Sequence, residues 1–394
     1  MALSMFFNRN KRIYADWAAT SPLSSEAVRA MRKASRAWAN PSAIHAEGVE
    51  ARRTLESARS LVAKTVCVKP DEVFFTSGGT EANATVIQGV LRMHLEKGTK
   101  PKDIHVVSTT IEHSSVLETL GLFEEHGVKV TYVRPKENGI VSADDMLAAV
   151  KKSTVLVTCM YANNEIGTIQ PVSKIGAGVR KIRAEKLAEW PVFHVDASQA
   201  PLWLACDIEG MRADAMTLDA HKMRGPKGVG ALIVRHHVSF MPLMVGGGQE
   251  RGKRPTTESV ALAAGFATAL VAAQSGRAAA SRSAEKARDL FFKLIDERLS
   301  GAVVNGSREK RLPNNVNLSF PNLSDPEFAV LKLDKAGIAC STKSSCLKGE
   351  EDSYVVKCLG GEAWRSRNTL RFTFGPDVSA TDIQRIVRAL SVLS

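Results

Sequence analysis

The stretch Val73-Phe-Phe-Thr-Ser-Gly-Gly-Thr-Glu-Ala-Asn83 contains a short apolar run, a glycine turn and the start of a polar helix. Val73 to Thr76 predicts a buried strand, which the Ser-Gly-Gly turn ends. Thr80 can cap the following helix, and the two glycines let the backbone approach an anion closely. Amides at the positive end of the helix dipole would then face a phosphate. A capped helix after a tight turn is the alternative, and the motif alone leaves both open.

Outward from this motif, helical and strand patterns alternate from residue 45 to about residue 235. Helices are predicted over residues 47–66 and from Thr80 to His94. Further strands are predicted at Ile104 to Ser108, Lys129 to Val133, Val155 to Met160, Val192 to Val195, Ala215 to Leu218 and Gly230 to Val234. Continuous Val/Ile-rich runs separated by helices indicate a mostly parallel sheet covered on both faces. We therefore expect an α/β fold with a mostly parallel seven-stranded sheet.

A second, smaller α+β domain is predicted beyond Gly246-Gly-Gly248, where the composition changes. An Ala-rich helix from Ser259 to about Leu299 would connect the two domains. The expected elements of the small domain are strands near Asn315 to Phe320 and Thr369 to Phe374, and helices near Glu327 to Ala336 and Ala380 to Leu393. We assign residues 18–260 to the large domain, and residues 1–17 and 261–394 to the small one.

Two polar motifs follow predicted strands. Asp196, in Phe193-His-Val-Asp-Ala-Ser-Gln199, stands at the carboxyl end of a strand, where open α/β sheets bind ligands. Its carboxylate could pair with a pyridinium nitrogen or cap the next turn. Lys222, in Asp219-Ala-His-Lys-Met-Arg-Gly-Pro-Lys-Gly228, has cationic neighbours that favour the neutral amine needed for a Schiff base. This context distinguishes it from an ordinary surface lysine.

His113, in Glu112-His-Ser-Ser115, lies just past the strand predicted to end at Ser108. A histidine in this position can stack on an aromatic ring and exchange protons near neutral pH. A lone histidine of this kind is more often structural, so both roles stay open.

Composition sets the broad class of the protein. The 394 residues are 44% hydrophobic and 24% charged, which fits a globular chain of about two domains. The six cysteines form no CxxC pair, so we expect neither a disulfide framework nor a metal site. No apolar run approaches the roughly 20 residues of a membrane-spanning helix.

The net charge of +12 favours an acidic partner or nucleic acid, yet the positive residues are scattered with little aromatic interleaving. We therefore expect a solvated basic surface and no direct nucleic-acid binding. The basic N-terminus lacks an apolar core and a cleavage site, so a cytoplasmic location without a signal peptide is expected. The alternative is the remnant of an organellar transit segment.

Taken together and in order, the motifs resemble those of the cysteine desulfurases, in the class V aminotransferase branch of the fold-type I pyridoxal-phosphate (PLP) enzymes. The resemblance covers nearly the whole chain. It rests on Tyr14-Ala-Asp-Trp-Ala-Ala-Thr-Ser-Pro22, Asn40-Pro-Ser-Ala-Ile-His45, Ser77 to Asn83, Glu112-His113, Asn163-Asn-Glu-Ile-Gly167, His194 to Gln199, His221-Lys222, Gly246-Gly-Gly-Gln-Glu-Arg251 and Leu370-Arg-Phe372.

The resemblance implies PLP as cofactor and a role for each matching residue. Lys222 would hold PLP as a Schiff base, and His113 would stack on its ring and shuttle protons. Asp196 would pair with the ring nitrogen. The remaining binding roles fall to Asn164 and Gln199 on the ring side, Gly79, Thr80 and His221 at the phosphate, Thr257 at the phosphate of a neighbouring subunit, and Arg371 at the substrate carboxylate.

The family's nucleophile lies in a loop that aligns with Ser341-Thr-Lys-Ser-Ser-Cys346, which makes Cys346 the expected nucleophile. A thiol must be activated, and Lys343 and Lys348 would favour the thiolate. Cys340 follows Gly337-Ile-Ala339 and is expected in a strand, buried, with a raised pKa.

Three positions depart from the family pattern. Trp17 replaces an asparagine and suggests a changed wall of the site, and Lys343 replaces a loop glycine. Asp219 replaces a serine that usually donates to the coenzyme phosphate, and an acid there would repel the phosphate unless a cation compensates. Asp219 is therefore not assigned to phosphate binding.

The resemblance implies removal of sulfur from L-cysteine, with alanine and a persulfide on Cys346 as products. It also implies a homodimer and a sulfur-accepting protein, either an iron–sulfur scaffold or a tRNA-thiolation carrier. The alternatives within the family are selenocysteine lyase, kynureninase-type cleavage and an aminotransferase, of which Cys346 disfavours the last two. An RNA- or partner-binding scaffold that has lost catalysis is disfavoured by Lys222, Asp196 and His113.

Overall fold

The computed structural model describes residues 12–186, 189–323, 325–342 and 352–392. Its centre is a seven-stranded sheet in the order β2-β8-β7-β6-β5-β3-β4. The strands are β2 (Val73–Thr76), β3 (His105–Thr109), β4 (Lys129–Val133), β5 (Thr154–Met160), β6 (Val192–Asp196), β7 (Ala215–Asp219) and β8 (Gly230–Val234). β8 runs antiparallel to β2 and β7, while β7, β6, β5, β3 and β4 run parallel to one another. The predicted mostly parallel sheet is confirmed.

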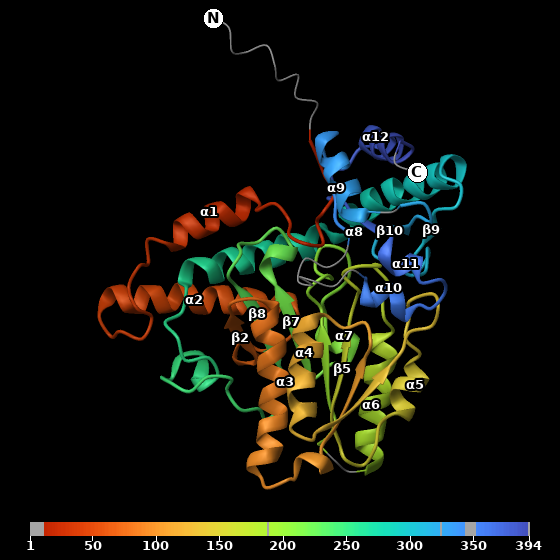
Figure 1. The fold of residues 1–394 in the computed structure, drawn as a ribbon. Helices are drawn as coiled ribbons and strands as arrows, with labels where there is room; N and C mark the ends of the chain where they lie inside the picture. The colour runs from red at the N-terminus through yellow and green to blue at the C-terminus, as the bar shows by residue number, and fades with distance from the viewer. Residues whose placement is uncertain (1–11, 187–188, 324, 343–351, 393–394) are drawn as a thin grey trace, which may run out of the picture.

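Helices cover both faces of this sheet (Figure 1), as continuous apolar strands require. Side chains alternate between the faces: in β8, Leu232 and Val234 join one apolar cluster while Ala231 and Ile233 join the other. The first cluster includes residues of α3 (Gly79–Glu96) and α4 (Ser114–Glu125). The second includes residues of α2 (Ala46–Thr65), α6 (Val172–Lys186) and α8 (Val260–Arg298).

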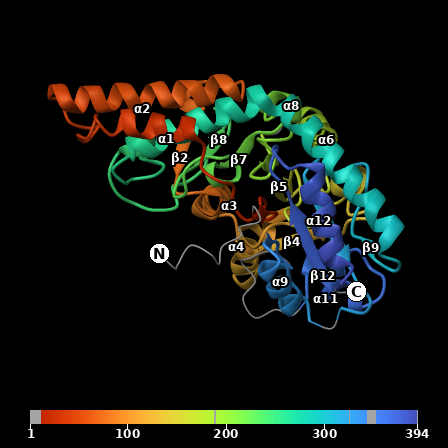
Figure 2. The same ribbon diagram turned by 90° about the horizontal axis from the view of Figure 1, so that it is seen from above.

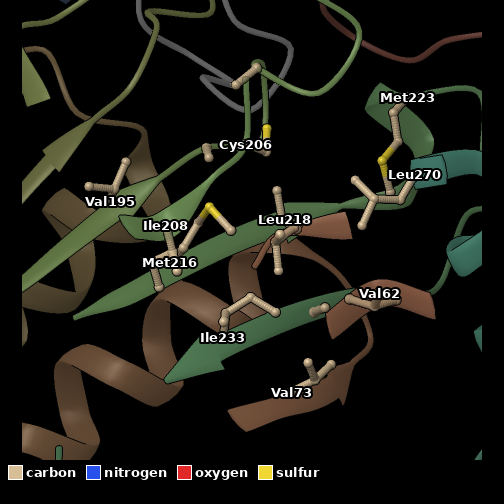
Figure 3. Packing of buried hydrophobic residues seen from close by; sticks show 14 of the residues in the cluster. Val62, Val73, Val195, Cys206, Ile208, Met216, Leu218, Met223, Ile233 and Leu270 are labelled. Atoms are coloured by element: carbon tan, nitrogen blue, oxygen red, sulfur yellow. The ribbon is translucent and has the colours of Figure 1, made fainter. Parts of the chain in front are cut away.

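Figure 3 shows the second of these clusters from close by. Met216 and Leu218 of β7 and Ile233 of β8 project from the sheet into this cluster, to which Leu270 of α8 also belongs. These side chains are buried, so the sheet edge that carries the polar strand ends rests on a packed core.

The C-terminal part of the chain builds a second core. Here β10 (Asn315–Ser319) lies between β12 (Thr369–Thr373) and β9 (Val303–Val304) in an antiparallel sheet. Helices α9 (Pro326–Lys335) and α12 (Ala380–Leu390) contribute to its apolar cluster, and α8 runs from the first core into this one (Figure 2). The division of the chain at residues 17/18 and 260/261 stays a prediction.

The N-terminal segment joins the two parts, because β1 (Ile13–Tyr14) pairs with β11 (Ile338–Ala339) before the chain enters the large sheet region. The remaining helices are α1 (Ser25–Ala34), α5 (Ala143–Ala148), α7 (Ile208–Met211), α10 (Tyr354–Cys358), α11 (Trp364–Arg367) and the short 3₁₀ turns η1 (Pro70–Glu72), η2 (Pro101–Asp103), η3 (Ala220–Lys222) and η4 (Gln249–Gly252). Within the described ranges, no helix combines the length and apolarity needed to cross a membrane.

Candidate active site

A cavity of about 180 Å³ lies at the carboxyl ends of β5, β6 and β7, beside the N-terminus of α3. The last residues of these three strands, Met160, Asp196 and Asp219, all line it. This is the edge at which open α/β sheets bind ligands. The lining also includes the predicted site residues Gly79, Thr80, His113, Asn164, Gln199, His221, Lys222 and Arg371.

Asp196 lies at one end of a hydrogen-bond network. Its Oδ2 accepts from Asn83 Nδ2 at 2.8 Å, and its Oδ1 accepts from the Ser198 backbone amide at 2.9 Å and the Ser198 hydroxyl at 2.6 Å. Three donors therefore fix the orientation of a largely buried carboxylate. The same residue thus caps the following turn and lines the cavity, so the two roles left open by its sequence are compatible.

His113 is joined to Asp196 through side chains. Asn83 Nδ2 also donates to Ser115 Oγ at 2.9 Å, and that oxygen lies 2.9 Å from His113 Nδ1. His113 precedes α4 as its N-cap, and its Nδ1 accepts from the Ser115 amide at 3.2 Å. Because Nδ1 accepts, the proton of the neutral ring lies on Nε2. His113 thus caps α4 and also lines the cavity, so the structural role does not exclude the functional one, which stays a prediction.

Glu112 lies behind His113 and is completely buried. Its Oε1 accepts from the Thr109 hydroxyl at 2.7 Å and from the Met160 amide at 2.9 Å. Burial raises the pKa of this carboxyl to about 7, against the lowering effect of the two hydrogen bonds. Glu112 thus connects the end of β3 with the end of β5, next to His113 in the chain.

Lys222 ends the 3₁₀ turn η3 that follows β7. Its Nζ donates to the carbonyl oxygens of Ala18 and Ala19 at 2.7 and 2.9 Å. The N-terminal segment is held there by further bonds, from Gln199 Nε2 to Ala18 O at 3.0 Å and from the Ser21 amide to His221 O at 2.8 Å. The amine is therefore fixed inside the cavity by main-chain acceptors.

Arg371 reaches the cavity from the other core. It lies on β12 with only 1% of its surface exposed, and its Nη1 donates to Asn164 O at 3.0 Å. Its Nη2 donates to Asp16 Oδ1 at 2.8 Å, and its Nε has no hydrogen-bond partner among the described residues. The ion pair with Asp16 offsets the cost of burying the guanidinium.

Some predicted residues lie elsewhere. Thr257 is exposed and is not among the residues that line this cavity, and its contact with a neighbouring subunit stays a prediction. Trp17, expected to change a wall of the site, is not among the lining residues; its ring lies against Gly375, where a side chain would have no room. Cys346 and Lys343 lie outside the described residues.

Sequence reasoning assigned no role to Asn83, Ser198 or Asp16. The first two stand inside motifs that were already suspected, and each is a short polar residue beside a predicted ligand-binding position. Their hydrogen bonds to Asp196 make them positioning residues. Asp16 pairs with a residue 355 positions away, and no local pattern could have signalled that contact.

The lining residues fit PLP. Three buried polar atoms have no hydrogen-bond partner within the described part of the chain, and their residues line the cavity: Asn164 Oδ1, Asn83 Oδ1 and His221 Nδ1. A buried polar atom of this kind needs a ligand or water partner. The chemical groups that PLP requires are also present. Lys222 offers an amine, Asp196 offers a carboxylate that can pair with the ring nitrogen of PLP, and α3 begins at Gly79 with its N-terminus at the cavity.

Comparison with known proteins agrees with this site. The aminotransferase class-V family model matches residues 13–386. The cysteine desulfurase IscS of Dictyoglomus turgidum is 35% identical over 395 residues, covering 98% of this chain and 96% of the relative. The cysteine desulfurase IscS of Stutzerimonas stutzeri is 36% identical over 392 residues, covering 97% and 93% of the two chains.

Solved structures support the same family. A NifS-like protein has a TM-score of 0.88 and 31% identity, covering 97% of this chain and 99% of its own. A structure described as SspA in complex with cysteine has a TM-score of 0.78 and 31% identity, covering 93% and 99% of the two chains. The chain belongs to the cysteine desulfurases of the class-V aminotransferase family.

Proposed function

We propose that this cysteine desulfurase holds PLP on Lys222 and transfers the sulfur of L-cysteine to Cys346, releasing alanine. The observation that supports it most is the convergence of Lys222, Asp196, His113 and Arg371 on one cavity. The residues come from strands and helices of both cores, and chance packing would not gather an amine, two opposite charges and an oriented imidazole there.

Bound at Lys222, PLP would supply an electron sink for the carbanion formed at the substrate Cα. Asp196 would hold the proton on the ring nitrogen, since its carboxylate is fixed by Asn83 and Ser198. Arg371 would orient the substrate through its carboxylate, and the Lys222 amine would take the Cα proton. His113, with its proton on Nε2, would shuttle protons beside the ring.

The sulfur step would then be a nucleophilic displacement. The Cys346 thiolate attacks the substrate sulfur, an S–S bond forms, and the substrate C–S bond breaks with its electron pair moving to Cβ. Protonation of that carbon yields alanine, and Cys346 carries the persulfide. A thiol reductant or an acceptor protein then removes the terminal sulfur.

The direct test is the release of sulfide and alanine from L-cysteine in the presence of a thiol reductant. Equal amounts of the two products are expected. Selenocysteine is offered in parallel, because selenocysteine lyase is the alternative activity. Turnover of selenocysteine with no alanine from cysteine, or production of pyruvate and ammonia instead of alanine, would contradict the proposal.

Arg371→Lys should raise KM for cysteine by roughly 10- to 100-fold and change kcat much less. Lysine keeps the positive charge beside Asp16 but loses the planar fork that binds a carboxylate with two hydrogen bonds. Steady-state kinetics measure the split. Arg367→Lys is the matched control, because Arg367 pairs with Asp352 on the surface. A fall in kcat of that size with an unchanged KM would show that Arg371 does not bind the substrate.

A homodimer is the expected assembly. Thr257 is exposed in a loop that also presents Val245 at 91% exposure, and the loop between α1 and α2 presents Trp38 at 79% and Ile44 at 93%. Both loops lie on the same side of the molecule in two views (Figures 1 and 2). Large exposed apolar side chains gathered on one side favour an interface.

Ile44→Glu should therefore weaken the dimer and lower PLP occupancy, since Thr257 would no longer reach the neighbouring phosphate. Light scattering after size-exclusion chromatography gives the mass, and absorbance gives the occupancy. Val392→Glu is the control, an apolar residue 82% exposed on the last turn of the described chain. A monomeric wild-type protein with full PLP occupancy would contradict the proposed assembly.

The sulfur acceptor is proposed to be an iron–sulfur scaffold or a tRNA-thiolation carrier, in a reducing cytoplasm. The rate of alanine release, measured with and without each purified acceptor, distinguishes the two classes. A true acceptor raises the rate because it removes sulfur from Cys346 and frees the thiol for another turnover.

A further inference from the structure

The phosphate end of the cavity already contains a carboxylate. Asp219, the last residue of β7, accepts a hydrogen bond at Oδ2 from the Gly79 amide at 2.7 Å. Gly79 is the first residue of the 18-residue helix α3, so this amide is one of the donors that the helix N-terminus offers to an anion. A Cβ added to Gly79 would lie 3.1 Å from the same oxygen, so the carboxylate lies directly over the glycine turn.

Few groups around Asp219 can offset its negative charge. His221 Nε2 lies 3.4 Å from Oδ2, and Lys222 follows in the same 3₁₀ turn. Ser198, at the turn after β6, faces the same glycine with its hydroxyl, and α3 contributes the Gly79 amide. Glu81, in the first turn of α3, is itself paired with Arg254 at 2.8 Å.

The carboxylate is charged at neutral pH. Burial opposes its ionisation, but the hydrogen bond and charge of His221, the Gly79 amide and the nearby Lys222 hold the pKa of Asp219 below its usual value. A phosphate monoester has a second pKa of about 6 and is mostly a dianion above pH 7. Two anions would then share one donor, and like charge raises the pKa of the incoming phosphate.

We infer that Asp219 makes coenzyme binding proton-linked: the site takes the phosphate together with a proton that the phosphate and the Asp219 carboxylate share. The inference rests on the proposed PLP cofactor. A group whose pKa is higher in the bound state binds at full strength below its free pKa, and affinity falls as pH rises through the bound pKa. The dissociation constant should therefore increase above about pH 6, by up to about tenfold per pH unit.

The test is equilibrium dialysis of PLP against wild type and Asp219→Asn at pH 6.5, 7.5 and 8.5. Asparagine keeps an oxygen that can accept from Gly79, so the turn is preserved while the charge is removed. The variant should bind PLP about tenfold more tightly at pH 8.5, equivalent to about 1.4 kcal/mol. Its dissociation constant should also change less with pH than that of wild type.

Two controls isolate the phosphate. Pyridoxal lacks the phosphate but has the same ring and aldehyde, so its affinity should be equal in wild type and variant at each pH. Asp207→Asn makes the same chemical change at the N-cap of α7, and asparagine caps as well as aspartate, so its PLP binding should match wild type.

The outcomes are distinct. Equal pH dependence of PLP binding in wild type and Asp219→Asn overturns the inference, as does an equal gain in affinity for pyridoxal. If borohydride traps neither ligand on Lys222 in either protein, the proposed cofactor itself fails. A gain restricted to PLP and largest at high pH supports the proton-linked site.

Discussion

Lys222→Ala should abolish the visible absorption of the purified protein and lower the rate of alanine formation by at least about a thousandfold. The Lys222 amine is proposed both to hold PLP covalently and to move the substrate Cα proton, so one substitution removes two functions. Its surroundings suit this role, because the carbonyl oxygens of Ala18 and Ala19 fix the amine at 2.7 and 2.9 Å inside the cavity.

The measurement combines an absorption spectrum with borohydride reduction and peptide mapping. In wild type the reduced label should lie on the peptide that contains Lys222, and in Lys222→Ala it should be missing while the fold, followed by circular dichroism, is unchanged. Lys181→Ala is the control, because Lys181 is 77% exposed on α6. Label recovered on another lysine in wild type would reassign the attachment site.

The strands were the most predictable part of the fold. Val155 to Met160 is apolar at every position except Thr158 because β5 is buried on both faces, and this pattern needs no tertiary information. The direction of β8 could not be predicted, since apolar runs read the same in parallel and antiparallel pairs. Helix α8 was located to within a residue at each end because its sequence is Ala-rich and contains no proline.

The candidate site was predictable where a single motif contains both the residue and its setting. Asp196 and Lys222 each end a strand–turn unit, and parallel strands bring such ends to the same edge. The connections between motifs were not predictable. Asn83 lies 113 positions from Asp196, and the contact depends on how α3 packs beside β6.

Asp219 also shows that contacts between residues far apart in the sequence could not be predicted. The sequence shows an acid where the resemblance implies a serine, and therefore predicts repulsion of a phosphate. It does not show that the carboxylate accepts from the Gly79 amide, because that bond spans 140 positions. The structure thus shows which group the substitution affects: the acid occupies the Gly79 amide at the N-terminus of α3.

Cys346→Ala should bind PLP and cysteine normally yet release no sulfide, while Cys340→Ala should keep most of the wild-type activity. The two thiols lie in the same segment, so the pair separates chemistry from local structure. Cys340 directly follows β11 and does not belong to it, which corrects the expectation that it lies in a strand. Its burial in the second core confirms the rest of that expectation.

The pKa of Cys340 explains why it cannot substitute for the proposed nucleophile. Burial raises the pKa of this thiol to about 12, with the Asp16 carboxylate adding to the effect. At pH 8 only about one molecule in ten thousand would carry the thiolate, the form that attacks sulfur. With 8% of its surface exposed, the thiol also cannot deliver sulfur to a separate acceptor protein. Replacing it with alanine should cost about 1 kcal/mol of stability and little activity.

Mass spectrometry after brief exposure to cysteine locates the sulfur. The mass increase of one sulfur atom should lie on the peptide containing Cys346 and disappear in Cys346→Ala, whose PLP spectrum should still change when cysteine is added. Cys358, half-buried on α10, is the internal control for non-specific sulfuration. If the sulfur lies on Cys340 while Cys346→Ala stays active, the alignment of this loop is wrong. The thiol with a pKa of about 12 would then have to become exposed during turnover, and the second core would have to open for each sulfur transferred.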